Sequence, residues 1–148
     1  MMNYCTRGKE KSHAEVFTSG GLCFEMCLNP DLRDLFTNVD ATVLDPAVGQ
    51  GQFPCTELVL KMFCNVDKLD EDLALRALRS LYGIDIQESS ITECKIHLLQ
   101  TLRDAYKFFT GNDFTRFDEA FAIVNENMVV GDSMKIMAEW TAPQPSLF

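Results

Sequence analysis

The sequence predicts an α/β fold with three layers (αβα), in which helices flank a short parallel sheet whose strands lie in the spatial order 3-2-1. Three short apolar runs, at 42–45, 81–86 and 127–130, have the length of buried strands, and each leads toward a helical pattern. Two glycines follow the first run, and an aspartate lies at or near the end of each run. Right-handed crossovers through the helices would make the strands parallel.

The loop after the first run is the most informative segment of the chain. Val43 and Leu44 are apolar, and Asp45-Pro46 ends the strand because proline donates no ladder hydrogen bond. Gly49 and Gly51 permit a tight turn and a close approach of the backbone to a ligand. A helix from Pro54 to about Asn65 follows. Strand, glycine loop and helix together are typical of a nucleotide-type pocket at the carboxyl end of a parallel strand.

The remaining elements are expected in the following order. A helix ends before Pro30, a short helix or a turn is expected at 31–36, and apolar spacing predicts further helices at 73–81, 89–109 and 134–140. Residues 67–72 form a charged connection, and 111–113 form a loop. The domain organisation is therefore a basic arm at 1–12, one domain at 13–140 and a tail at 141–148.

Composition limits the possible functions. The net charge of −9 opposes strong nucleic-acid binding by this chain alone, since neutralising phosphates requires clustered Lys and Arg. No apolar run is long enough to cross a bilayer and the start is not a secretory signal, so we expect a cytoplasmic protein without a membrane contact. The six cysteines show no zinc-ligand spacing, so we expect free, mostly buried thiols and no metal.

Asp85 ends the second apolar run and has two possible roles. At that point of an α/β unit an acid typically accepts hydrogen bonds from ribose hydroxyls. The separation from Gly51 is 85 − 51 = 34 positions, longer than in a simple NAD-binding fingerprint. Alternatively, Asp85 caps a helix that begins at Ser89 or Ser90. We favour ribose binding. His97, in the long helix that follows, is expected to be a packing residue.

The segment Asp45-Pro46-Ala47-Val48-Gly49-Gln50-Gly51-Gln52-Phe53 resembles the Asp-Pro-Ala-x-Gly-x-Gly-x-Phe motif of S-adenosylmethionine-dependent DNA adenine-N6 methyltransferases. The resemblance is to the group that includes modification subunits of type I restriction systems. It implies a Rossmann-like methyltransferase fold and S-adenosyl-L-methionine as the cofactor. The cofactor-binding residues that it implies here are Asp45, Pro46, Ala47, Gly49, Gly51 and Phe53.

Three shorter segments extend the resemblance. Glu15-Val16-Phe17-Thr18 is similar to the family's x-Val-Phe-Thr-Pro segment, which implies that Phe17 and Thr18 hold the methionine carboxylate, although Ser19 replaces the proline. Gly83-Ile84-Asp85-Ile86 resembles the second motif, in which Asp85 would bind the ribose and Ile86 would pack on adenine. Gly131-Asp132-Ser133 resembles the third motif, whose acid, here Asp132, accepts a hydrogen bond from the adenine amino group.

The family's catalytic loop, Asn-Pro-Pro followed by Tyr or Phe, does not occur in the sequence, so no catalytic residue is assigned. The chain therefore resembles the cofactor-binding half of a methyltransferase. One hypothesis is a split or truncated DNA methyltransferase that needs a partner, either a second copy or a complementary methyltransferase subunit, and meets DNA only through it. The second is a non-catalytic S-adenosylmethionine-binding regulatory protein. The third is an anti-restriction interaction protein that mimics a modification subunit. The acidic charge favours the second and third slightly.

Overall fold

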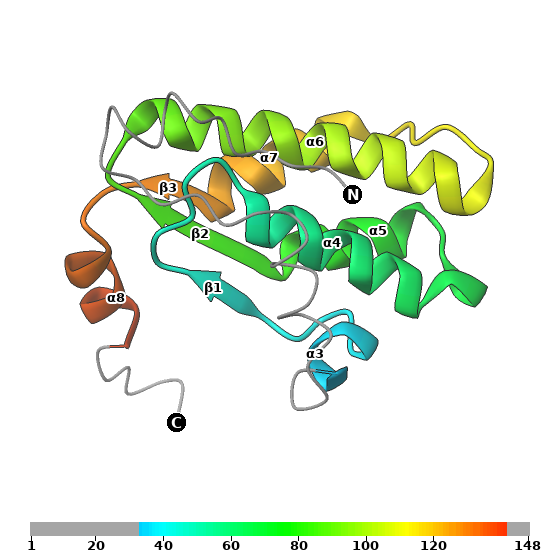
Figure 1. Cartoon of the computed structure of the whole chain (residues 1–148), viewed down its shortest axis with the longest axis horizontal. Helices are drawn as coiled ribbons and strands as arrows, with labels where there is room; N and C mark the ends of the chain where they lie inside the picture. The colour runs from blue at the N-terminus through cyan, green and yellow to red at the C-terminus, as the bar shows by residue number, and fades with distance from the viewer. Residues whose placement is uncertain (1–32, 142–148) are drawn as a thin grey trace.

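A computed structural model describes residues 33–141 (Figure 1). Three parallel strands, β1 (Val43–Asp45), β2 (Leu81–Asp85) and β3 (Met128–Val130), form one sheet in the order β1-β2-β3. Asp45 pairs with Gly83, and Asp85 pairs with Val130, so the carboxyl ends of the strands lie along one edge. The predicted α/β class, the parallel sheet and the strand order are confirmed.

Helices precede β1, fill the two connections between the strands and follow β3. In the described residues they are α3 (Arg33–Thr37), α4 (Gln52–Cys64), the 3-10 helix η2 (Val66–Lys68), α5 (Glu71–Arg79), α6 (Glu88–Thr110), α7 (Phe117–Asn127) and α8 (Ser133–Thr141). The short helix or turn expected at 31–36 and the helices expected at 54–65, 73–81, 89–109 and 134–140 all have counterparts. Helix α7 was not predicted, and it fills most of the segment between α6 and β3.

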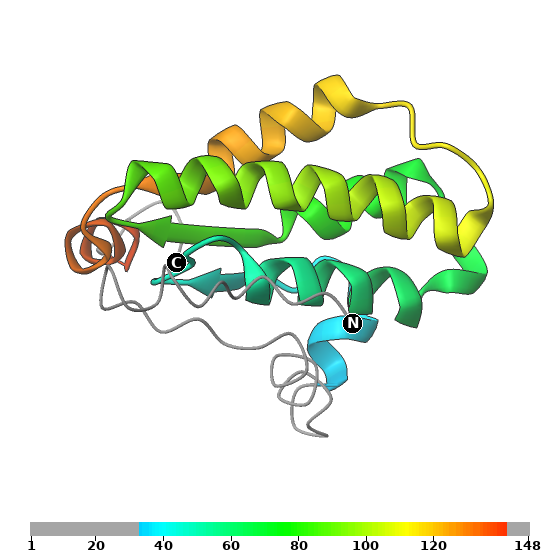
Figure 2. The same ribbon diagram turned by 45° about the horizontal axis from the view of Figure 1, so that its top comes forward.

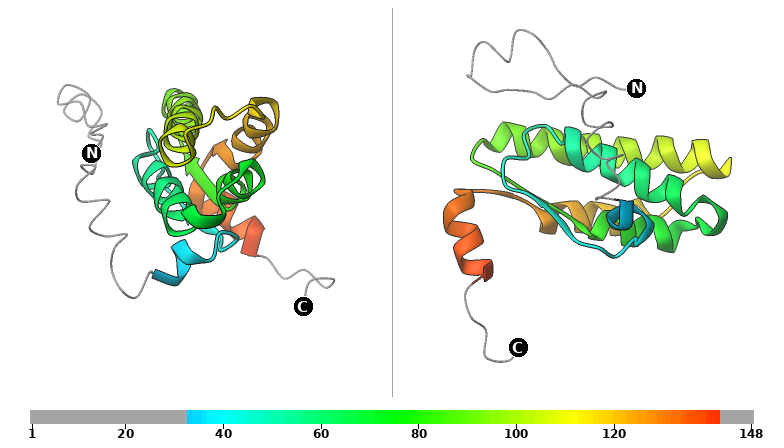
Figure 3. Two further views of the ribbon diagram at one scale, coloured as in Figure 1. Left: turned by 90° about the vertical axis from the view of Figure 1, so that its right-hand side faces the viewer. Right: turned by 60° about the horizontal axis from the view of Figure 1, so that its bottom comes forward.

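The apolar core lies between the sheet and helices α4 to α7 (Figures 2 and 3). Leu81 and Met128 point from the strands into this core, and Val43 packs against it. Gly83 lies between the side chains of Val48 and Met128, and a methyl group there would lie 2.7 Å from Val48. On the other face, Trp140 of α8 packs edge-on against Tyr82, with ring centroids 6.3 Å apart. The four core helices thus form the main helical layer of the described structure.

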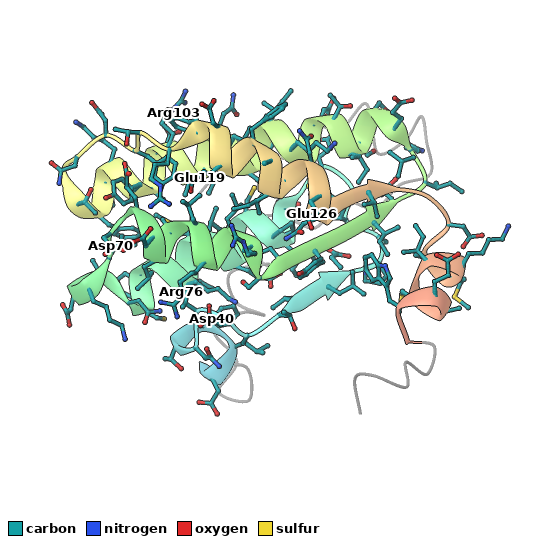
Figure 4. All side chains as sticks on the ribbon, turned by 180° about the vertical axis from the view of Figure 1, so that it is seen from behind. Asp40, Asp70, Arg76, Arg103, Glu119 and Glu126 are labelled. Carbon is teal, nitrogen blue, oxygen red and sulfur yellow. The ribbon has the colours of Figure 1, made fainter. Side chains whose placement is uncertain are left out.

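Buried polar contacts fix the segments that lead into β1. The Lys61 amino group, on α4, donates to the carbonyl oxygens of Val39 at 3.1 Å and Ala41 at 2.5 Å, and to the Ser80 hydroxyl at 2.7 Å. On the surface, Arg76 of α5 and Asp40 point toward one another and form an ion pair (Figure 4). The start of β1 is therefore attached to both α4 and α5, which sets where its carboxyl end lies.

The burial of single apolar residues and cysteines varies along the helices. Cys55 and Cys94 are buried, as expected, whereas Cys64 is exposed. On α6, 48% of the Ile96 surface is exposed, so the buried face of this helix does not include all of its apolar residues. Among residues 33–141, no helix has both the length and the apolar character needed to cross a membrane.

Candidate functional site

The loop between β1 and α4 makes the tight turn that its glycines indicate. Gly49 has φ 56° and Gly51 has φ 93°, values that side chains disfavour. The N–H of Val48 donates to the carbonyl of Ile84 at 2.9 Å, which attaches the loop to β2. A methyl group on Gly51 would lie 2.8 Å from the Cys94 sulfur, so α6 also leaves no room for a side chain there.

Asp85 holds this loop with its carboxylate. One oxygen accepts from the Gly49 N–H at 3.0 Å, and the other accepts from the Gln87 N–H at 2.8 Å. Helix α6 begins at Glu88, and its N-cap residue is Gln87, so the alternative in which Asp85 caps a helix at Ser89 or Ser90 is wrong. A carboxylate has about four acceptor positions, and two of those on Asp85 are used, which leaves two for a ligand.

His97 of α6 forms a further attachment. Its Nδ1 atom lies 2.7 Å from the Gln50 carbonyl oxygen. Because a carbonyl only accepts, this contact places the proton on Nδ1. The residue was expected to serve packing alone, and it also fixes the glycine loop. Nothing in the local sequence signals this contact, because the two residues are 47 positions apart.

A cavity of about 300 Å³ lies at the carboxyl ends of the strands. This volume is at the small end of the range for ligand sites, about 300–1,000 Å³. Five residues expected from separate motifs line it, and Gly131 and Ser133 complete the lining; the five are Pro46, Ala47, Asp85, Ile86 and Asp132. The N–H of Gly131 donates to the carbonyl of Asp85 at 2.9 Å, which joins the second and third segments.

The other expected site residues have different positions. Asp45 ends β1, and its side chain accepts from the Ala47 N–H at 3.0 Å, so it shapes the start of the loop. Gly49 and Gly51 form the turn, and Phe53 lies in the first turn of α4. None of these four residues lines the cavity. The expected contacts of Phe17 and Thr18 lie outside the described residues.

The cavity and its surroundings are acidic. Asp85 and Asp132 line it, and its described lining contains no Lys or Arg. Burial raises the pKa of Asp45, and the negative charge of Asp85 raises it further. The hydrogen bond from the Ala47 N–H acts in the opposite direction and lowers this pKa. Such a site favours a ligand that donates hydrogen bonds or carries positive charge, and it disfavours a polyphosphate.

Farther along α4, Glu57 and Lys61 are both buried. Burial raises the pKa of Glu57 to about 7, and the negative charge of Asp45 adds to this effect, while the positive charge of Lys61 opposes it. Burial lowers the pKa of Lys61 to about 8, although the charges of Glu57 and Asp40 act in the opposite direction.

Gln52, the first residue of α4, was not predicted as a site residue. Its side chain is 6% exposed, and neither the Oε1 nor the Nε2 atom has a hydrogen-bond partner. The N-cap residue Gly51 provides no side-chain hydrogen bond to the start of the helix. A polar residue beside the glycines is a weak sequence signal, because its burial depends on residues distant in the chain.

A second hollow, of about 350 Å³, lies beside β1 and is lined by Thr42, Val43, Leu44, Tyr82 and Trp140. It contains the Tyr82–Trp140 contact on the face of the sheet that α8 meets. Among the described residues, no group of three or more His, Cys, Asp and Glu is arranged to hold a metal ion.

The fold and the site together define a parallel α/β domain with an acidic cavity where its strands end. Comparison of the chain with protein-family models, with curated proteins and with solved structures finds no match. The proposal of a function therefore rests on the residues of this chain and their arrangement.

Proposed function

We propose that the chain binds S-adenosyl-L-methionine or its demethylated product, and that it is the cofactor-binding part of a split or truncated DNA adenine-N6 methyltransferase. One observation carries the proposal: residues from three separate segments, 46–47, 85–86 and 132, line a single cavity at the carboxyl ends of parallel strands. Ligands of open α/β sheets bind at this edge. The Rossmann-like methyltransferase half-domain belongs to the same proposal.

The lining residues suit the parts of this ligand. Asp85 keeps two acceptor positions, which match the two ribose hydroxyls. Ile86 is 75% exposed and presents an apolar surface to the adenine ring. Asp132 uses one oxygen to accept from the Met134 N–H, and its other oxygen is available for the adenine amino group. The acidic surroundings favour the positive sulfonium and ammonium groups of the cofactor.

A partner is part of this proposal. The sequence has no Asn-Pro-Pro-aromatic loop, so the group that accepts the target amino group would come from another chain, a complementary methyltransferase subunit or a second copy. DNA would then be contacted through that partner, in agreement with the net charge of −9. Such an assembly would work in the cytoplasm, away from membranes.

The test is calorimetric titration of the purified chain with S-adenosylmethionine and its demethylated product. Asp85→Ala and Asp132→Ala should each weaken binding by about ten- to a hundredfold, the effect of losing one charge-assisted hydrogen bond. Glu126→Ala is the matched control, because Glu126 is an exposed carboxylate on α7, labelled in Figure 4, that does not line the cavity. Absence of binding by the wild type, or unchanged affinity in both aspartate variants, would contradict the proposal.

The acidic charge also favours a second candidate, a cofactor-binding regulatory protein or anti-restriction mimic without transfer activity. Mixing the chain with a complementary methyltransferase fragment separates the candidates. If transfer of a labelled methyl group to adenine appears only in the mixture, the split enzyme is supported. If the chain binds the cofactor but suppresses transfer by an intact methyltransferase, the mimic is supported.

A further inference from the structure

The geometry of α4 points to a further binding residue: we propose that the Gln52 side chain binds the amino-acid end, the α-carboxylate and α-ammonium groups, of the ligand whose nucleoside end occupies the cavity. This inference rests on the proposed function and deepens it. It assigns a specificity-determining residue that the sequence motif leaves unspecified.

The first step is the state of the amide group. Both polar atoms of the Gln52 side chain are buried, and neither has a hydrogen-bond partner. An unsatisfied buried polar group costs about 1–3 kcal/mol, so native structures retain few of them. The two atoms belong to the same side chain and lie next to a glycine loop. The presence of these two atoms is explained if a bound ligand forms hydrogen bonds with both of them.

The second step is the position of Gln52. It is the first residue of α4, a helix of 13 residues, and it directly follows Gly51. Side chains in a helix tilt toward its N-terminus, so that of Gln52 is directed back over the loop 49–51. That loop continues from Pro46 and Ala47, which line the cavity. A ligand that extends from the cavity across the loop therefore reaches Gln52.

The third step is the chemistry of the helix start. At the start of α4, Gln52 and Phe53 have N–H groups without a partner within the helix, because the Gly51 N–H donates to the Val48 carbonyl and Pro54 has no N–H. The N-cap residue of α4 supplies no side-chain cap. These N–H groups and the helix dipole favour a carboxylate. The Gln52 Nε2 atom would donate to the same carboxylate, while Oε1 would accept from an ammonium group. An amino-acid group uses both atoms, whereas a phosphate would leave Oε1 unpaired.

The experiment compares two ligands that differ at the amino-acid end. S-adenosylhomocysteine carries this end, and 5′-methylthioadenosine has the same nucleoside without it. Calorimetry on the full chain with Gln52→Met, which keeps the length of the side chain but removes its polar atoms, should show about tenfold or greater loss of affinity for S-adenosylhomocysteine. Affinity for 5′-methylthioadenosine should stay unchanged. Gln100→Met, at an exposed glutamine on α6, is the matched control and should alter neither affinity.

Thermal unfolding provides a second readout. Because Gln52→Met removes two unsatisfied buried atoms, the unliganded variant should unfold at the same temperature as the wild type or higher. Unchanged binding of S-adenosylhomocysteine, or an equal loss for both ligands, would overturn the role of Gln52 while leaving the proposed function in place. Failure of the wild type to bind either ligand would overturn the proposed function and this inference together.

Discussion

The buried carboxyl of Glu57 makes the stability of the domain depend on pH in an unusual direction. The side chain is 7% exposed on α4. Burial raises its pKa from the ordinary value of 4.5 to about 7 in the folded chain, and the charge of Asp45 contributes to this rise. Between these two values the folded state retains a proton that the unfolded state has released. Glu57 therefore favours folding most at low pH, and this contribution is lost as the pH rises.

The magnitude follows from the size of that interval. From 4.5 to about 7, at about 1.4 kcal/mol for each pH unit, the free energy of unfolding should decrease by about 3 kcal/mol. The effect of Lys61 lies at higher pH, because burial lowers its pKa to about 8. Deprotonation of the folded state there makes stability increase again between about pH 8 and 10.5, the ordinary value for lysine.

Urea denaturation at closely spaced pH values, on the wild type and on Glu57→Gln, isolates the contribution of this group. The free energy of unfolding of the wild type minus that of the variant should decrease by about 3 kcal/mol from pH 4.5 to 7. Subtraction removes the titration of groups common to both proteins. Glu126→Gln, at an exposed position, is the control for the removal of one carboxylate from the chain. A flat or rising difference for Glu57→Gln would refute the reasoning.

Two further substitutions test the packing that positions the site. Gly83→Ala should destabilise the domain by about 1–3 kcal/mol, because the new methyl group would lie 2.7 Å from Val48 and 2.8 Å from Met128. Urea denaturation measures this loss, and a variant as stable as the wild type would contradict the packing around Gly83. Asn127→Ala should cost about 1–3 kcal/mol, since the Asn127 amide donates to the Arg79 and Leu81 carbonyls. Thermal unfolding at the wild-type temperature would show that water replaces those bonds.

The sequence was most informative where a single local segment carries the structure. Each strand is a compact apolar run and the glycines indicate the turn directly, so local patterns predicted the strands and the loop. The five cavity residues were predicted from the short motifs that resemble those of methyltransferases. Helix α7 was missed because its buried apolar residues, Ala120, Ile123 and Val124, are few, and only the three polar residues 125–127 separate them from the apolar residues of β3. Its exposed Phe121 further obscures the apolar face.

Other features depend on residues far apart in the chain. The contact between His97 and Gln50 and the burial of Lys61 arise only when helices pack, so no local pattern predicts them. A lysine in a helix is ordinarily read as a surface residue. Here Lys61 satisfies three acceptors in the segments leading into the first two strands. The helices and strands could therefore be predicted from sequence patterns, whereas the roles of these polar residues depend on tertiary contacts.

The edge of β1 is where the proposed partner would add a strand. In the described sheet β1 pairs with β2 alone. The Val43 N–H points toward β2, where it donates to the Ser80 carbonyl, so the alternation of a strand directs the Leu44 N–H to the free edge. The hollow next to this edge includes Leu44, Tyr82 and Trp140, which an added strand would cover. A parallel strand there would end beside the glycine loop, where a catalytic loop is needed.

Leu44→Pro tests this arrangement. Proline is tolerated in an edge strand where its nitrogen faces away from the ladder, and it removes the donor that the partner would use. We expect the variant to lose association with a second copy or with a complementary methyltransferase fragment, measured by light scattering at micromolar concentration. Calorimetric binding of S-adenosylhomocysteine should remain, which verifies that the domain is folded. Association at wild-type strength would show that the partner binds at another surface and that the β1 edge is not the interface.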